Sequence, residues 1–146
     1  MDFGTTRFGR IRIQPKDLLT FPQGLVGLPD CRRWVLLADA ANDQLAWLQS
    51  VDRPELALAV ASPRRLVPGQ RFRVARQQLS CIELAEPQAA EVLVVLSRSE
   101  RGLTANLRAP IVINVVRRLG CQAIVNGDSS LSHALQGPFD LVRRSA

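Results

Sequence analysis

WVLLADAANDQLAWLQSVDRPELALAVAS, residues 34–62, is the stretch that decides the fold class. It contains three short apolar runs, at residues 34–38, 45–51 and 56–62. The segments between them carry aspartate, asparagine and proline, which favour turns. Short apolar runs bounded by turn residues are typical of all-β sandwiches and barrels. The stretch therefore predicts three consecutive strands.

The same pattern continues on both sides of this stretch. It predicts further strands at residues 6–13, 18–21, 71–74, 91–97, 103–116 and 121–125. Loops at residues 98–102 and 117–120 are expected to close hairpins between the later strands. Pro110 interrupts the longest predicted strand. Because proline has no amide hydrogen to donate, it predicts a bulge or an edge position there.

Helical patterns in the sequence are few and short. Residues 77–84 place apolar side chains on one side and end before Pro87, so they are the best candidate for a short helix. Residues 29–33 are a candidate for a single helical turn. Because parallel sheets need crossover helices, the sheet is predicted to be mostly antiparallel. We therefore expect a single all-β, barrel-like domain at residues 1–128, with one or two short helices, followed by a loosely held polar tail at residues 129–146.

The composition is that of a folded domain in a reducing compartment. The chain has 146 residues, of which 47% are apolar, and this suits one domain with its own core. Cys31, Cys81 and Cys121 are far apart and show no metal-binding spacing, so we expect free thiols. The sequence has no signal-peptide pattern at its start and no run of about 18 apolar residues. A cytoplasmic protein with no membrane partner is expected.

Catalytic patterns are missing from the sequence. The one histidine, His133, lies in the polar tail, where a shaped Ser/His/Asp or Cys/His site is not expected. Residues 21–28 contain two glycines but neither phosphate-binding spacing. Turn formation explains the acidic residues that fall in loops with proline or asparagine, which are Asp39, Asp43, Asp52 and Glu55. We therefore expect a protein that is not an enzyme and that needs no cofactor or metal.

The net charge of +6 makes binding of RNA or another anionic ligand the alternative function. Lys16 is the only lysine, and the arginines are scattered rather than massed. A barrel that binds single-stranded RNA needs aromatic side chains among its cations. Only Phe72, between two arginines, meets this description, and a core position on an alternating strand explains it as well. Trp34 and Trp47 are expected in the core, although a tryptophan partly exposed at a strand end can anchor a partner.

Four stretches together resemble the flagellar assembly factor FliW family. They are TRFG (residues 6–9), LTFPQGLVGL (19–28), WLQSVDRPEL (47–56) and NLRAPIVIN (106–114). They occur in the family's order and spacing, and the resemblance covers residues 5–128. It implies a cytoplasmic regulator that binds newly made flagellin and the translational repressor CsrA, without direct contact to nucleic acid. Capture of CsrA would lift its block on flagellin messenger RNA, and export of flagellin would free the regulator for that capture.

The charge of the chain departs from this resemblance. FliW-like proteins tend to be acidic, which suits a basic RNA-binding repressor. This chain has a net charge of +6 and carries Gln23 and Arg53 where acids are common in the family. Three explanations stay open: an acidic repressor, a mainly apolar interface, or binding of flagellin alone.

Two of the resembling stretches supply candidate protein-binding residues. The turn-dense loop at residues 21–28 either covers the barrel mouth or exposes an apolar anchor. The strand that contains Pro110 either offers an open edge to an extended partner segment or is a bulged core strand. Asn106 and Asn114 either satisfy backbone groups at strand ends or touch a partner. The candidate residues are Phe21, Leu25, Val26, Leu28, Asn106, Arg108, Pro110 and Asn114.

Overall fold

The computed structural model describes residues 1–69, 72–100, 102–125 and 133–134. Regular structure in this part of the chain is mostly β-strand. The strands are β1 (Asp2–Thr5), β2 (Gly9–Arg12), β3 (Leu18–Thr20), β4 (Arg33–Ala38), β5 (Ala46–Ser50), β6 (Ala57–Ala61), β7 (Ala90–Ser99), β8 (Gly102–Ala105), β9 (Ile111–Asn114), β10 (Leu119–Gln122) and β11 (His133–Ala134). The helical elements are η1 (Pro15–Asp17), α1 (Pro63–Leu66), η2 (Arg76–Ile82) and η3 (Pro87–Ala89).

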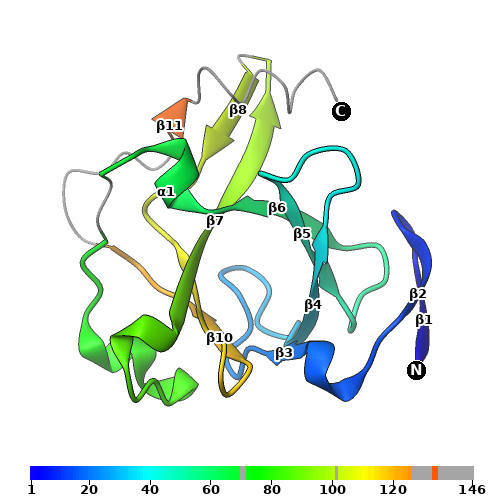
Figure 1. The fold of residues 1–146 in the computed structure, drawn as a ribbon, viewed down its shortest axis with the longest axis horizontal. Helices are drawn as coiled ribbons and strands as arrows, with labels where there is room; N and C mark the ends of the chain where they lie inside the picture. The colour runs from blue at the N-terminus through cyan, green and yellow to red at the C-terminus, as the bar shows by residue number, and fades with distance from the viewer. Residues whose placement is uncertain (70–71, 101, 126–132, 135–146) are drawn as a thin grey trace.

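Seven of the strands close into a barrel (Figure 1). Each strand hydrogen-bonds to the next in the order β7, β6, β5, β4, β3, β10 and β9, and β9 pairs back to β7 to complete the ring. Among the described strands the pairings are antiparallel, apart from the parallel pairing of Leu119 in β10 with Thr20 in β3. The predicted all-β, mostly antiparallel barrel is confirmed. Observed strands overlap the predictions at residues 18–21, 34–38, 45–51, 56–62, 91–97 and 121–125.

The strand predicted at residues 103–116 is observed as two strands, β8 and β9, which both pair with the long strand β7. The C-terminal half of β7 pairs with β8, and its N-terminal half pairs with β9. Residues 106–110 lie between β8 and β9 and outside the assigned strands, although the Asn106 amide still donates to the Val95 carbonyl of β7 at 2.9 Å. The prediction of one continuous strand was wrong, because Pro110 lacks the amide donor that would continue the ladder.

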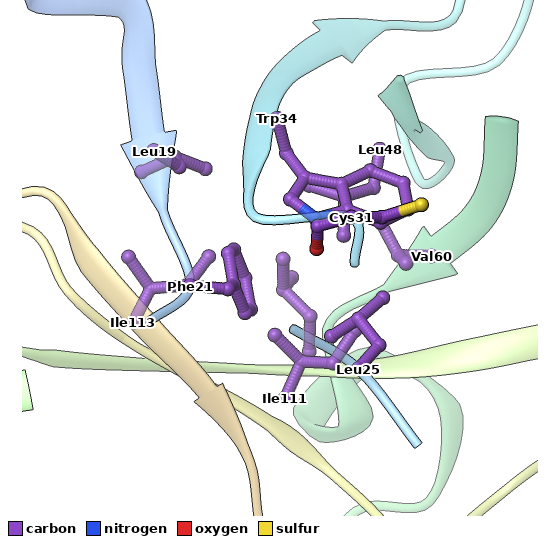
Figure 2. Close-up of a cluster of buried hydrophobic side chains, with 10 residues drawn as sticks. Leu19, Phe21, Leu25, Cys31, Trp34, Leu48, Val60, Ile111 and Ile113 are labelled. Carbon is purple, nitrogen blue, oxygen red and sulfur yellow. The ribbon is translucent and has the colours of Figure 1, made fainter. Parts of the chain in front are cut away.

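Buried side chains from distant parts of the chain fill the barrel interior (Figure 2). The cluster consists of Leu19, Phe21, Leu25, Cys31, Trp34, Leu48, Val60, Leu93, Ile111 and Ile113. Trp34 is fully buried, as predicted, and its Nε1–H donates to the Cys31 carbonyl at 2.9 Å. The Trp34 and Phe21 rings meet edge to face with centroids 6.4 Å apart. Gly120 of β10 makes room for this ring pair, because a Cβ there would lie 2.5 Å from the Phe21 Cζ.

The N-terminal segment forms a separate hairpin of β1 and β2. The strand predicted at residues 6–13 is confirmed at β2 and was wrong at residues 6–8, which form the turn. The Thr5 Oγ1 accepts a hydrogen bond from the Phe8 amide and donates one to the Gly9 carbonyl, both at 2.8 Å. Gly9 has a φ of +68°, a conformation that favours glycine. These local hydrogen bonds close a turn within a stretch whose alternating apolar and polar residues predict a continuous strand.

The helical turn predicted at residues 29–33 is absent, and this prediction was wrong. The Asp52 carboxylate accepts hydrogen bonds from the amides of Arg32 and Arg33, at 2.8 and 2.9 Å. It thereby holds this segment extended at the start of β4. The carboxylate comes from the loop between β5 and β6, so the local sequence around residues 29–33 gives no sign of it.

The segment between β6 and β7 carries α1, η2 and η3, but no strand among its described residues. The strand predicted at residues 71–74 is wrong over its described part, residues 72–74. Phe72 and Val74 instead pack into two different apolar clusters. The short helix predicted at residues 77–84 is confirmed in place as the 3₁₀ helix η2. Most of the predicted polar tail lies outside the described residues, and its described part, β11, pairs with β8.

Candidate protein-binding surface

The loop at residues 21–28 buries most of its apolar side chains and exposes one. Phe21 and Leu25 lie in the core, and Leu28 packs against the core half-buried. Val26 has 64% of its surface exposed. A tight turn produces this division, since Leu25 and Leu28 exchange backbone hydrogen bonds of 3.1 and 2.8 Å. Phe21 and Leu25 therefore perform the packing role expected of the loop, and Val26 is its exposed apolar side chain.

Gln122 of β10 ties this loop to the segment that precedes β9. Its Oε1 accepts a hydrogen bond from the Val26 amide at 2.8 Å, and its Nε2 donates to the Ala109 carbonyl at 3.0 Å. Arg108 is exposed next to Ala109. Ile124, 46% exposed, follows Gln122 by two residues, as expected for neighbours on one outward face of an extended chain. We call Val26, Arg108, Gln122 and Ile124 the loop surface.

Two of the predicted residues, Val26 and Arg108, thus lie on segments that the Gln122 side chain joins. The sequence analysis missed Gln122 and Ile124. Alternation with the buried residues Cys121 and Ala123 is a local signal that both side chains point outward. No local signal shows that Gln122 binds Val26, because 96 positions separate the two residues.

Asn114 is buried, and its side chain forms hydrogen bonds with backbone groups. Its Nδ2 donates to the carbonyls of Ile82 and Glu83, at 2.8 and 3.2 Å, at the end of η2. Its Oδ1 accepts from the amides of Val116 and Arg117, at 3.1 and 3.2 Å. These hydrogen bonds fix the hairpin between β9 and β10 against η2.

That hairpin presents two exposed valines, which we call the hairpin tip. Val116 has 74% of its surface exposed, and Val115 has 45%. Beside them, Arg117 forms an exposed ion pair with Glu83 at 3.0 Å. An exposed pair of this kind adds little stability, so its main effect is on the charge next to the tip. The sequence analysis did not single out Val115 or Val116.

Asn106 and Pro110 also form hydrogen bonds with backbone amides. The Asn106 Oδ1 accepts a hydrogen bond from the Arg108 amide at 3.1 Å, which forms a turn outside the sheet. Pro110 is buried, and its carbonyl accepts a hydrogen bond from the Ala123 amide at 2.9 Å. Of this segment's predicted residues, Arg108 is the one whose side chain is exposed.

Ion pairs and carboxylate hydrogen bonds shape the charge of the described surface. Burial alone would raise the pKa of Asp52. Hydrogen bonds from the amides of Arg33 and Arg32, together with the Arg33 guanidinium, outweigh this and hold the pKa below its ordinary value. Gln23 and Arg53 are both exposed. The ion pairs among the described residues are Arg12–Asp2, Arg33–Asp52 and Arg117–Glu83.

The described residues offer neither a metal-binding cluster nor a helix that could cross a membrane. Within the described ranges, no group of three or more His, Cys, Asp or Glu side chains is arranged to hold a metal ion. All three cysteines are free thiols, with Cys31 and Cys121 buried. No described helix has both the length and the apolar character needed to cross a membrane.

Comparison with known proteins identifies the family of this chain. The sequence model of the FliW protein matches residues 2–135. The chain belongs to the FliW family. A flagellar assembly factor FliW of Geotalea uraniireducens is 35% identical over 130 residues, which cover 88% of this chain and 79% of that protein. A flagellar assembly factor FliW of Bdellovibrio bacteriovorus is 31% identical over 131 residues, which cover 88% of this chain and 75% of that protein.

A solved structure supports the same assignment. The crystal structure of a flagellar assembly factor FliW matches this structure with a TM-score of 0.82 and 30% sequence identity. The match covers 93% of this chain and 95% of that one. The resemblance to the FliW family is therefore confirmed in both sequence and fold.

Proposed function

We propose that this protein is a flagellar assembly factor that works in the cytoplasm as a protein-binding regulator, without catalysis. Its partners are flagellin and the translational repressor CsrA, and its capture of CsrA relieves repression of flagellin translation. The observation that carries this proposal is the FliW match over residues 2–135, together with relatives that are named flagellar assembly factors. The matching barrel of a solved FliW structure supports it.

Regulation of this kind needs no covalent step. When two partners share one limited binding protein, the partner in excess occupies it by mass action. As free flagellin falls, more of the protein is left to bind CsrA, and flagellin synthesis rises. When flagellin accumulates, it occupies the protein, CsrA is released and synthesis stops.

The loop surface and the hairpin tip are the parts that we propose to meet the partners. Val26 and Val116 are strongly exposed apolar residues. The amides of Val26 and Val116 donate hydrogen bonds to the Gln122 Oε1 and the Asn114 Oδ1, which hold the two turns in place. Pre-ordered apolar anchors lower the entropy cost of binding. Three explanations are open for how a chain of net charge +6 fits the FliW family. These features favour the explanation in which the interface with the partner is mainly apolar.

Direct RNA binding is not proposed. Phe72, the aromatic residue that the sequence placed between two arginines, is partly buried and packs against the cluster that contains Leu96 and Leu103. Its ring is therefore used in packing. An RNA-binding barrel would need exposed aromatic faces among its cations.

Calorimetric titration with flagellin and with CsrA from the same organism tests the proposal. Val26→Asp and Val116→Asp each place a charge in the proposed apolar contact. We expect saturable binding of both partners to the unmodified protein, with weak salt dependence. At least one of the two variants is expected to bind about tenfold more weakly or worse.

Leu36→Asp is the matched control, since Leu36 is an exposed apolar residue of β4, outside both proposed surfaces. It is expected to bind as the unmodified protein does. Binding of neither partner by the unmodified protein contradicts the proposed function. Loss of binding in the Leu36 variant equal to that in the other two contradicts the proposed surfaces.

A further inference from the structure

A cavity of about 550 Å³ lies where β6 and the β7–β8 hairpin diverge. In Figure 1 this hairpin stands up and away from the barrel strands β5 and β6. Leucine and alanine residues of β6, β7 and β8 form most of the wall, together with Trp47 of β5. Arg7, Asp39 and Arg98 supply the charged groups of the lining. The cavity therefore combines an apolar wall with ionised groups.

Both the backbone and the side chains of β6 border this cavity. Three consecutive residues of the strand, 57–59, line it. Side chains on one face would contribute only alternate residues. In the described structure β6 pairs with β7 only at Val60–Val95 and Ala61–Val94, and beyond these pairs β7 continues with β8 on its other edge. The edge of β6 at residues 57–59 thus faces the cavity without a strand partner among the described residues.

Two cations border the cavity. The Arg7 guanidinium lies over the Trp47 ring, 4.2 Å from its centroid. Arg98 comes from the exposed end of β7. Neither arginine forms an ion pair with a carboxylate of the described residues. The Asp39 carboxylate is already engaged, since it accepts hydrogen bonds from the Trp47 Nε1 at 2.9 Å and from two backbone amides.

We propose that this cavity binds an extended, acidic segment of a partner protein, which adds as a strand to the edge of β6. Backbone hydrogen bonds to residues 57–59 hold the segment. A carboxylate side chain pairs with Arg98, and Arg7 adds positive charge at the same cavity. An apolar side chain two residues along lies on the same face, against Leu96. The inference rests on the proposed function only in that the partner is a protein.

A peptide fits this cavity better than single-stranded RNA does. A base would need an exposed aromatic face on which to stack. Here Arg7 covers a face of Trp47, and the Phe8 ring approaches the indole in a T-shaped contact with centroids 5.9 Å apart. The rest of the wall is leucine and alanine, which suits aliphatic side chains. The two free cations then select an acidic sequence.

An NMR titration with a synthetic peptide tests the inference. The probe is acetyl-Thr-Leu-Thr-Glu-Thr-Leu-Thr-amide, which places glutamate and leucine on one face of an extended chain. We expect shifts in the amide signals of residues 57–59 and in the indole signal of Trp47. The indole signal of Trp34, which is fully buried in the core, is expected to stay in place. Absence of shifts at residues 57–59 and Trp47 overturns the proposal.

Charge and backbone pairing are tested separately. The same peptide with lysine in place of glutamate, and the variant Arg98→Gln, are each expected to bind about tenfold more weakly. Arg64→Gln is the matched control, because Arg64 is exposed on α1 and does not line this cavity. Bound peptide is expected to slow amide hydrogen exchange at residues 57–59. Equal binding by Arg98→Gln and the unmodified protein, or unchanged exchange, overturns the proposal.

Failure of this inference can be told apart from failure of the proposed function. If flagellin or CsrA binds but the peptide does not, the cavity proposal alone is wrong. If the peptide binds as described but neither protein does, the cavity site stands and the proposed function is wrong. If a short oligouridylate shifts the same signals more strongly than the peptide, the cavity binds RNA and the peptide proposal is overturned.

Discussion

Replacing Asn114 by alanine removes the hydrogen bonds that tie the hairpin between β9 and β10 to η2. Two of them run from Nδ2 to the carbonyls of Ile82 and Glu83, and two run to Oδ1 from the amides of Val116 and Arg117. A hydrogen bond contributes about 0.5–1.5 kcal/mol net, and a buried group left without its partner costs about 1–3 kcal/mol. We therefore expect Asn114→Ala to lower the free energy of unfolding by about 2–4 kcal/mol.

Urea unfolding, followed by circular dichroism, measures this loss. With a slope of about 2 kcal/mol per molar urea, the midpoint is expected to fall by about 1–2 M. Asn106→Ala is the control, because the Asn106 side chain is only half-buried and accepts one hydrogen bond, from the Arg108 amide. It is expected to cost about 1 kcal/mol or less. Equal destabilisation by the two variants would refute the role given to Asn114.

Other predictions concern the core, a thiol and a carboxylate. Gly120→Ala is expected to cost about 1–3 kcal/mol, because its Cβ would lie 2.5 Å from the Phe21 ring; an unchanged urea midpoint contradicts this. Burial raises the pKa of Cys121 from 9.0 to about 12, so alkylation by iodoacetamide at pH 8 should be about a thousandfold slower than for an ordinary thiol; mass spectrometry that finds equal rates contradicts this. The folded pKa of Asp52 lies below its ordinary 3.8, so its stabilisation is present above 3.8 and is lost as pH falls through the folded pKa. Asp52→Asn should therefore lower stability at pH 7 and flatten its acid dependence, and an unchanged pH profile of stability would speak against this.

The barrel strands were predictable wherever apolar runs are bounded by turn residues. The strands at residues 34–62 follow this rule, and β4, β5 and β6 occupy them. The break between β8 and β9 was only partly predictable. Pro110 shows that the ladder loses a donor, but the number of residues that leave the sheet depends on how β7 pairs on both sides of the break.

The candidate surface was less predictable than the fold, because it depends on contacts between distant segments. The sequence marks residues 21–28 as a turn but does not show that Leu25 packs inward while Val26 projects. Gln122 decides the position of Val26 from 96 residues away. Trp47 was expected in the core, yet it is only half-buried and lines a cavity that exists because β6 and β7 diverge.

A competition experiment tests whether flagellin and CsrA share this protein as a common binder. Fluorescently labelled CsrA is first bound to this protein, and flagellin from the same organism is then added while the anisotropy of the label is followed. We expect CsrA to form a saturable complex and flagellin to release it in proportion to the amount added. Failure of CsrA to bind, or a CsrA complex that excess flagellin leaves intact, would contradict the claim that two partners compete for this protein.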